Sequence, residues 1–479
     1  MSRLTIPWPA RVIIRGHPTS GRRHHLAYNA PLPASVNTTG KSIARNWASQ
    51  RTIWWRSGVP EYCSKESEVL PLENIRVLSF GTGGVGPDSC KILGELGADV
   101  IKIESKDNLD FMRTIGPDIN NIAGFNEANR SKRSFSVSLK TEKGRELVGK
   151  LIKIADILVE NFRGGVMKSL GFDYENARKL NPEIIYVSSQ GFGGGGPFSD
   201  FQAYGPMLSS ASGMLSIWAQ PDDPYPVGSN SPLPDHMASK HVVIAALAAL
   251  DYRHRTGKGQ FIDMAQTEVA ASLIGEHHLD YTINKRVAKP MGNRSPYAAP
   301  HGCYACKGAD EWCAIAVFTD EEWRSFCDAV GNPAWTKDPK FADLLGRLQN
   351  VDELDRMIGE WTATLEAREV MEVLQAAGVA AGVVQRATDT LADPQLEWLG
   401  AIVELDHPVA GKRLYPGVPF RLSGCPPLQS TPAPLLGQHT EEICRDLLGM
   451  SEDEIKRLID EDVLHNPESA KGAGGSMFG

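Results

Sequence analysis

The stretch from Ile75 to Glu104 constrains the fold of this chain more than any other. Its sequence, IRVLSFGTGGVGPDSCKILGELGADVIKIE, contains an apolar β-rich run, a segment with apolar residues at helical spacing, and a second β-rich run. Gly81, Gly83 and Gly86 fall before the helix, where they allow a tight turn and close approach of a ligand to the backbone. This is a βαβ unit. Its spacing is the G-x-G-x-x-G dinucleotide fingerprint, with Glu104 placed for a ribose hydroxyl; a turn that binds nothing is the alternative.

The same alternation of strand and helix continues along the chain. The sequence from Asn129 to Phe162 predicts a basic turn, a strand, a helix from about Thr141 and another strand, and PEIIYVSSQ predicts a further strand. We therefore expect an α/β fold, with a Rossmann-like parallel sheet in a large domain and a smaller α+β domain. The predicted divisions are an extension at 1–70, the large domain at 71–285, the small domain at 286–388, the rest of the large domain at 389–466 and a disordered tail at 467–479.

The composition excludes several classes of protein. The chain has 479 residues, of which 42% are hydrophobic, and its net charge of -8 argues against nonspecific binding to nucleic acid or to an anionic membrane. No apolar run reaches the length that spans a membrane. Eight cysteines are too sparse for a disulfide scaffold and are typical of a reduced intracellular protein. Cys303 and Cys306 form a C-x-x-C without a second pair at zinc-site spacing, so we expect no metal.

The first 70 residues differ from the rest of the chain. No Asp or Glu occurs before Glu61, and arginines recur among serines, threonines and prolines. This composition is typical of a mitochondrial transit peptide. Prolines interrupt any long amphipathic helix there, so a disordered extension or a start codon placed too far upstream are the alternatives, with a cytoplasmic protein as the consequence.

Asp235 is the candidate catalytic residue. It follows Pro234 at the head of a predicted helix of small residues, from Ala238 to Leu250. An aspartate there can also be an ordinary helix cap with no chemical role. The residues alone leave both interpretations open.

Several ordered blocks of the sequence resemble one family. They are PLENIRVLSFGTGGVGP, LGADVIKIE, NRSKRSFSVSLKTEKGRE, ADILVENFRGGVMKSLGF, LNPEIIYVSSQGFGGGGP, RTGKGQFID, GNRSPYAAPHG and PLLGQHT. Over about residues 71 to 465 they resemble the class III coenzyme A transferases, which include formyl-CoA, carnitine, succinate-hydroxymethylglutarate and benzylsuccinate transferases and the fold-related acyl-CoA racemases. The resemblance implies a Rossmann-like fold adapted to CoA and an interlocked homodimer, and it makes the dinucleotide fingerprint a false positive.

The resemblance also implies a reaction. Asp235 falls on the nucleophile of the family, which attacks an acyl-CoA thioester to give an acyl-aspartyl anhydride and then an aspartyl-CoA thioester. An acceptor acid opens this thioester in the reverse sequence. Acyl-CoA and a small carboxylic acid are thus the expected substrates, with no permanently bound cofactor.

Further residues match the CoA-binding segments of the family. Gly84 and Val85 occupy the loop near the thioester, whereas the segments that line the adenine and phosphate pocket contain Lys132, Arg133, Lys140, Asn161 and Phe162. A solvated basic face and core packing are the ordinary alternatives for these side chains. Ser105 and Ser169 stand where relatives often have arginine, so some phosphate contacts are expected to be lost or supplied elsewhere.

One departure from the family pattern bears on the reaction. Where the racemases have a histidine and an aspartate, this chain has Tyr204, Gly205 and Pro206. A racemase needs a base on each face of the α-carbon, so this departure favours CoA transfer. The alternatives are an α-methylacyl-CoA racemase-like enzyme, a catalytically silent CoA-binding protein and, from the glycine motif alone, an NAD dehydrogenase.

Overall fold

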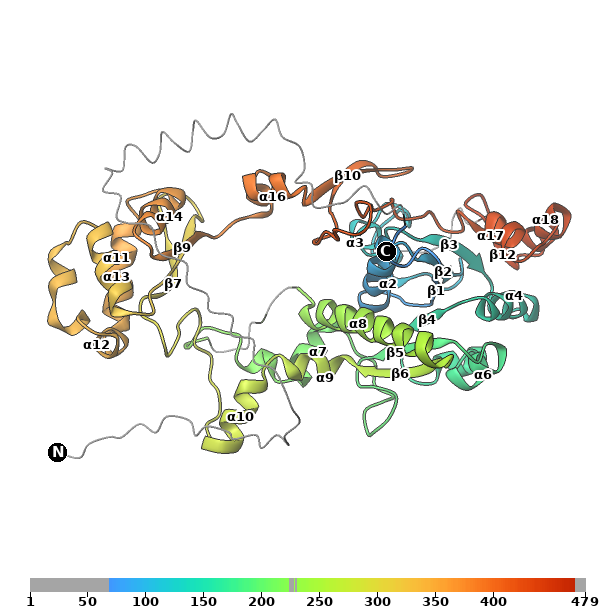
Figure 1. Cartoon of the computed structure of the whole chain (residues 1–479), viewed down its shortest axis with the longest axis horizontal. Coiled ribbons are helices and arrows are strands. Elements are labelled where there is room, and N and C mark those ends of the chain that lie inside the picture. Colours follow the sequence, from blue (N-terminus) through green and yellow to red (C-terminus); the bar gives the residue numbers. More distant parts are fainter. Residues whose placement is uncertain (1–68, 224–227, 229–230, 470–479) are drawn as a thin grey trace, which may run out of the picture. The chain divides into compact units, whose positions relative to one another are not determined.

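The largest sheet in the described part of the chain has seven strands (Figure 1). The computed structural model describes residues 69–223, 228 and 231–469. The sheet has the order β12-β3-β2-β1-β4-β5-β6 and is parallel throughout, except that β12 pairs antiparallel with β3. Its strands are β1 (Arg76–Ser79), β2 (Asp99–Glu104), β3 (Arg133–Val137), β4 (Ile157–Glu160), β5 (Ile185–Gln190), β6 (Gln260–Ala265) and β12 (Leu464–His465). The predicted α/β fold with a parallel sheet is confirmed.

Helices cover both faces of this sheet because its strands are apolar on both faces. Val77 packs into the core on one side and the next residue, Leu78, into the core on the other. The first side is covered by α2 (Val85–Glu95) and α8 (Leu233–Thr256). The second is covered by α4 (Glu142–Lys153), α5 (Val166–Leu170), α6 (Tyr174–Leu180), α17 (Thr440–Asp446) and α18 (Glu452–Asp460).

Shorter elements connect these layers. They are η1 (Phe111–Thr114), α3 (Ala123–Ala128), α7 (Gly205–Ala211), η2 (Met214–Ser216), α9 (Gln266–Ser272) and α10 (Gly275–Asn284). Helix α10 has no buried residue, which sets it apart from the helices on the sheet.

A second, antiparallel sheet has a hydrophobic core of its own. Its strands β7 (His301–Ala305), β8 (Trp312–Ala316) and β9 (Ala380–Val383) lie in that order. Trp323, Phe326 and Ile358 are in its core, contributed by the helices α11 (Asp320–Ala329) and α13 (Val351–Thr362). The same region contains η3 (Ala334–Lys337), η4 (Pro339–Phe341), α12 (Leu344–Gln349) and α14 (Ala367–Ala376). It is followed in the chain by α15 (Ala387–Leu391), α16 (Pro394–Leu399) and the hairpin of β10 (Ile402–His407) and β11 (Gly411–Pro416). The domain boundaries themselves stay predictions.

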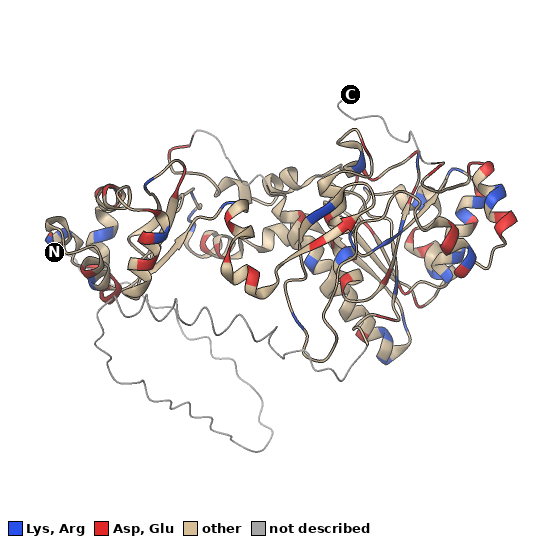
Figure 2. Cartoon of the chain, turned by 90° about the horizontal axis from the view of Figure 1, so that it is seen from above, with Lys and Arg blue, Asp and Glu red and all other residues tan. Residues whose placement is uncertain are grey.

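Residues 1–68 and 470–479 lie outside the described residues, and with them lie nearly all of the predicted extension and most of the predicted tail. In the described part of the chain, no helix combines the length and the apolar character needed to cross a membrane. Basic and acidic residues are mixed along the elements instead of being separated by sign (Figure 2).

Candidate active site

The candidate site lies at the carboxyl edge of the central sheet, between β1 and β4. After β1 the chain adds β2 and β3 on one side, and it then returns to add β4 and β5 on the other. Strands β1 and β4 therefore flank a topological switch point, the place where open α/β sheets bind ligands. The glycine turn follows β1, whereas Asn161 and Phe162 follow β4.

The glycine turn is held closed by backbone contact and by Asn161. A Cβ atom on Gly81 would lie 2.7 Å from the Cα of Gly86, so neither position has room for a side chain. The side chain of Asn161 accepts a hydrogen bond from the amide of Thr82 and donates one to the carbonyl of Thr82, both at 2.9 Å. Asn161, a predicted CoA-binding residue, thus fixes the shape of the turn.

A buried ion pair supports the other side of the turn. Lys102 Nζ lies 2.8 Å from Asp110 Oδ2, and the two side chains are only 1% and 0% exposed. Lys102 also donates to the carbonyl of Gly81, and Asp110 accepts from the amide of Gly83 at 3.0 Å. Burial would raise the pKa of Asp110, but the charge and hydrogen bond of Lys102 outweigh it and lower that pKa.

Glu104 does not occupy the role that the dinucleotide fingerprint gives it. Its carboxylate is buried and accepts from Arg113 Nε at 3.0 Å and Nη2 at 3.1 Å. Arg113 is fully buried and its guanidinium stacks 3.6 Å from the ring centroid of Phe125. Because both oxygens of Glu104 are taken by this bidentate pair, the acid is not available to a ribose.

Asp235 lies in the first turn of α8 but does not cap it. The helix begins at Leu233 with Pro232 at the cap position, and none of the described residues donates a hydrogen bond to the carboxylate of Asp235. The cap interpretation is therefore wrong. A Cβ on Gly84 would lie 3.1 Å from Asp235 Oδ2, and one on Gly205 would lie 2.9 Å from it, so the carboxylate sits between two glycines. Burial raises its pKa to about 6, although the neighbouring His236 opposes the rise.

A cavity of about 950 Å³ brings the site together. Five of the predicted site residues line it: Gly84, Val85, Asn161, Phe162 and Asp235. It has the volume of a small-molecule site and the position expected from the switch point.

Comparison with known proteins identifies the family. The family model of CoA-transferase family III matches residues 72–440. The chain belongs to this family.

Relatives agree with the match. The transferase is 32% identical over 418 residues to formyl-CoA:oxalate CoA-transferase of Bradyrhizobium sp. (strain ORS 278), covering 83% of this chain and 98% of that one. It is 34% identical over 407 residues to "Probable CoA-transferase Rv1866" of Mycobacterium tuberculosis, covering 83% of this chain but only 51% of that longer protein. In structure it is similar to a CAIB/BAIF family protein from Brucella suis, with a TM-score of 0.73, 31% identity and coverage of 79% of this chain and 99% of that one.

Three predicted CoA-binding residues of the transferase do not line the cavity. Lys132 is buried and its Nζ donates to two backbone carbonyls and to Asn129 Oδ1 at 2.8 Å. Arg133 pairs with Asp99, and the exposed Lys140 pairs with Asp107 at 3.2 Å. Lys132 and Arg133 line a separate cavity of about 530 Å³. Their contact with CoA stays a prediction.

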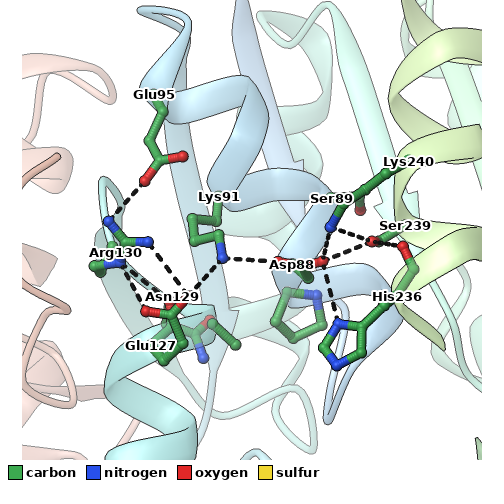
Figure 3. A network of polar contacts seen from close by, with 12 residues as sticks. Asp88, Ser89, Lys91, Glu95, Glu127, Asn129, Arg130, His236, Ser239 and Lys240 are labelled. Carbon is green, nitrogen blue, oxygen red and sulfur yellow. Dashed lines mark hydrogen bonds and ion pairs between the residues drawn. The ribbon is translucent and has the colours of Figure 1, made fainter. Parts of the chain in front are cut away.

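The cavity contains charged residues that sequence reasoning missed. Asp88, Lys91, Glu127, His236 and Lys240 line it and belong to one network of ion pairs (Figure 3). Asp88 is buried on α2, where burial would raise its pKa, but His236, Lys91 and Lys240 outweigh burial and lower that pKa far below its ordinary value. The only available signal in the sequence was an acidic residue directly after the glycine turn, in the first turn of the predicted helix.

Arg163 is a second missed residue. It follows Asn161 and Phe162, lines the cavity and is exposed. None of the described acids forms an ion pair with it. Its place in the VENFR block was the signal that could have drawn attention to it.

Within the described residues, no group of three or more His, Cys, Asp or Glu side chains could hold a metal ion.

Proposed function

We propose that this transferase moves CoA from an acyl-CoA thioester to a free carboxylic acid, with Asp235 as the covalent nucleophile. One observation carries the proposal. The carboxylate of Asp235 faces a cavity of about 950 Å³, has glycine on two sides, and receives no hydrogen bond from the described residues. A carboxylate in this state is poorly stabilised and open to an incoming thioester.

The chemistry follows from these groups. An oxygen of Asp235 attacks the thioester carbonyl carbon, the C–S bond breaks, and an acyl-aspartyl anhydride and CoA thiolate form. The thiolate attacks the aspartyl carbonyl, the anhydride C–O bond breaks, and the first acid leaves. The carboxylate of the acceptor acid then attacks the aspartyl-CoA thioester, and the same steps in reverse return Asp235 and release the new acyl-CoA.

Each step passes through an oxyanion, which needs hydrogen-bond donors. Helix α2 begins at Val85 beside Asp235, and none of the described side chains caps it. The first amides of a helix have no partner within the helix and carry its positive dipole end. We assign the amides at the start of α2 as the donors, and Gly84 as the residue that leaves them accessible.

The anionic part of CoA needs a cation. Arg163 has an exposed guanidinium at the cavity without an ion-pair partner among the described acids. An arginine fork suits phosphate geometry. We propose that Arg163 supplies a phosphate contact that Ser105 and Ser169 cannot make, and that Asn161 and Phe162 adjoin the bound nucleotide. CoA is a substrate in this scheme, so no permanently bound cofactor is required.

Screening of acid pairs identifies the acyl group of the donor and the acceptor acid. The name of the Bradyrhizobium relative makes formyl-CoA and oxalate the first pair to test. The racemase alternative needs a second base opposite Asp235. Gly205 has no side chain that could act as this base, although a Cβ built on it would lie only 2.9 Å from Asp235 Oδ2. Exchange of the α-proton of an acyl-CoA in heavy water would be the sign of that alternative.

We further propose a homodimer. Helix α10 has no buried residue, and the exposed fractions of its Leu279 and Ile283 are 62% and 72%. Apolar faces of this kind are typical of surfaces that a second subunit covers.

The mitochondrial address of residues 1–70 stays a prediction and is tested by locating a tagged chain with and without that segment.

Trapping the intermediate tests the function. The full chain is incubated with formyl-CoA and oxalate, or with other pairs from a screen, and treated with hydroxylamine. Peptide mass spectrometry should find a hydroxamate on Asp235, because only a thioester or anhydride of that carboxylate reacts under mild conditions. Asp235→Asn should give no adduct and should lose several orders of magnitude in turnover. An adduct elsewhere, or near-normal transfer by the variant, would remove Asp235 from the mechanism.

A further inference from the structure

Two successive amides in the turn between β1 and α2 differ in what they bind. The amide of Gly83 donates to Asp110 Oδ1 at 3.0 Å. The next amide, that of Gly84, donates to none of the described residues, and α2 starts one residue later at Val85. A Cβ on Gly84 would lie 3.1 Å from Asp235 Oδ2, so the unbound amide is beside the proposed nucleophile. A group that orients this turn therefore acts on the oxyanion that forms there.

Asp110 holds the turn through one of its two oxygens. Besides the Gly83 amide, Asp110 Oδ1 accepts from Thr82 Oγ1 at 3.2 Å and from the amide of Met112 at 3.0 Å. Met112 belongs to η1, so this oxygen joins the glycine turn to the segment that follows β2. The two segments also touch directly, because a Cβ on Gly83 would lie 2.7 Å from Phe111 Cε1. The position of the turn thus depends on Asp110.

The second oxygen of Asp110 is bound by Lys102. Lys102 Nζ donates to Asp110 Oδ2 and to the carbonyl of Gly81, both at 2.8 Å. A buried ion pair is costly to desolvate and often stabilises a fold no more than apolar side chains of the same volume. Stability alone therefore does not explain this pair. An anion next to the turn would also oppose an oxyanion, and Lys102 cancels that charge.

We infer that Asp110 is a positioning residue for CoA transfer, which orients the amides of Gly84 and Val85 toward the oxyanion, with Lys102 as its neutralising partner. The inference rests on the proposed function. The side chain of Asp110 is 0% exposed and does not line the cavity, so it acts through the turn and not by contact with the substrate. Donors that are held in place in advance stabilise the transition state more than the bound substrate. Loss of Asp110 should therefore slow the covalent step and leave CoA binding nearly intact.

Two double variants of the full chain isolate the oxygen that holds the turn. Both contain Lys102→Met, so neither leaves an unpaired charge in the interior. Asp110→Asn in the first variant keeps an oxygen that can accept from the Gly83 amide, whereas Asp110→Ala in the second removes it. The control combines Lys456→Met with Asp460→Asn, because these residues form an exposed ion pair of the same types in α18, at 3.0 Å.

Hydrogen exchange reports on the turn and needs no substrate. In the variant with Asp110→Ala, peptides that cover residues 81–88 should exchange at least about tenfold faster than in the normal chain, as expected for loss of a charge-assisted hydrogen bond. The variant with Asp110→Asn and the control should exchange like the normal chain.

Covalent capture reports on the chemistry. The probe is formyl-CoA at saturation, or the donor found by screening, with hydroxylamine present. The rate of hydroxamate formation at Asp235 should fall about tenfold to a hundredfold in the variant with Asp110→Ala and less than about threefold in the variant with Asp110→Asn. The Kd for CoA, measured by calorimetry, should change less than about threefold in both variants.

Three results would overturn the inference. They are normal exchange of the turn after Asp110→Ala, faster exchange with an unchanged rate of capture, and equal losses in capture rate and CoA affinity, which would indicate a general structural role. Equal losses of rate in both variants would also overturn it and assign the effect to Lys102. A normal chain that forms no adduct at Asp235 would overturn the proposed function and the catalytic role of Asp110 with it, whereas the exchange measurement would still show whether Asp110 holds the turn.

Discussion

Asp235 occupies a position where its charge is costly to the folded chain. Its carboxylate lies between Gly84 and Gly205 without a hydrogen bond from the described residues. Burial raises the pKa from 3.8 to about 6. The folded protein therefore keeps the proton of Asp235 over a pH range in which the unfolded chain has lost it. The contribution of this group to stability is largest below pH 3.8 and is lost as the pH rises through about 6.

Asp235→Asn should therefore not destabilise the protein. At pH 8 we expect its free energy of unfolding to exceed that of the normal chain by about 1 to 3 kcal/mol, since the variant has no charge to bury at that site. At pH 4 the two should differ little. Urea unfolding at both pH values measures the difference. A variant that is less stable at pH 8 would mean that the carboxylate makes favourable contacts in the folded state.

At the scale of elements, the turn between β1 and α2 depends on contact between two backbones. Gly86→Ala should open it, because the new Cβ would lie 2.7 Å from Gly81 Cα and 2.8 Å from Asn161 Oδ1. We expect a loss of about 1 to 3 kcal/mol in unfolding free energy and weaker CoA binding. Gly149→Ala in α4 is the matched control, because its Cβ would meet only Leu180 Cδ1 at 3.7 Å. That control should gain about 0.5 to 1 kcal/mol and bind CoA normally.

Local signals in the sequence predicted these elements better than they predicted the contacts between them. Ser451 and Glu454 form a capping box at the start of α18, a motif that depends on neighbouring residues alone. The helix predicted from Ala238 to Leu250 extends from Leu233 to Thr256, since prolines are compatible with a first turn.

The candidate site was predictable where the chain matches a family block and not where distant residues meet. The first group includes Gly84, Asn161 and Asp235, which line one cavity. Ser239 Oγ donates a hydrogen bond to Asp88 Oδ2 at 2.6 Å, although the two residues are 151 positions apart in the sequence. No pattern in one sequence indicates such a contact. Nothing in the sequence indicated the ion pair between Glu104 and Arg113 either, and this pair leaves Glu104 unavailable to a ribose.

At the scale of the whole molecule, the exposed apolar side chains predict a dimer. Leu279 and Ile283 lie four residues apart on α10 and so share one face. The normal chain should have twice the mass of one copy in light scattering. The double variant Leu279→Asp, Ile283→Asp should shift it toward a single copy, because charges at a buried interface lose hydration. Leu345→Asp, which introduces one such charge at another exposed leucine, should leave the mass unchanged. A single-copy mass for the normal chain would contradict the prediction.

The pairing of β12 with β3 has a consequence for synthesis on the ribosome. Ser136 in β3 and His465 in β12 are in contact across 329 residues of sequence. The first strands emerge early, yet β3 keeps an unpaired edge until almost the whole polypeptide has been translated. An open edge of this kind can pair with other nascent chains. Ribosome pausing late in translation, or a premature stop before codon 464, would therefore leave an aggregation-prone product even though most of the sheet had been made.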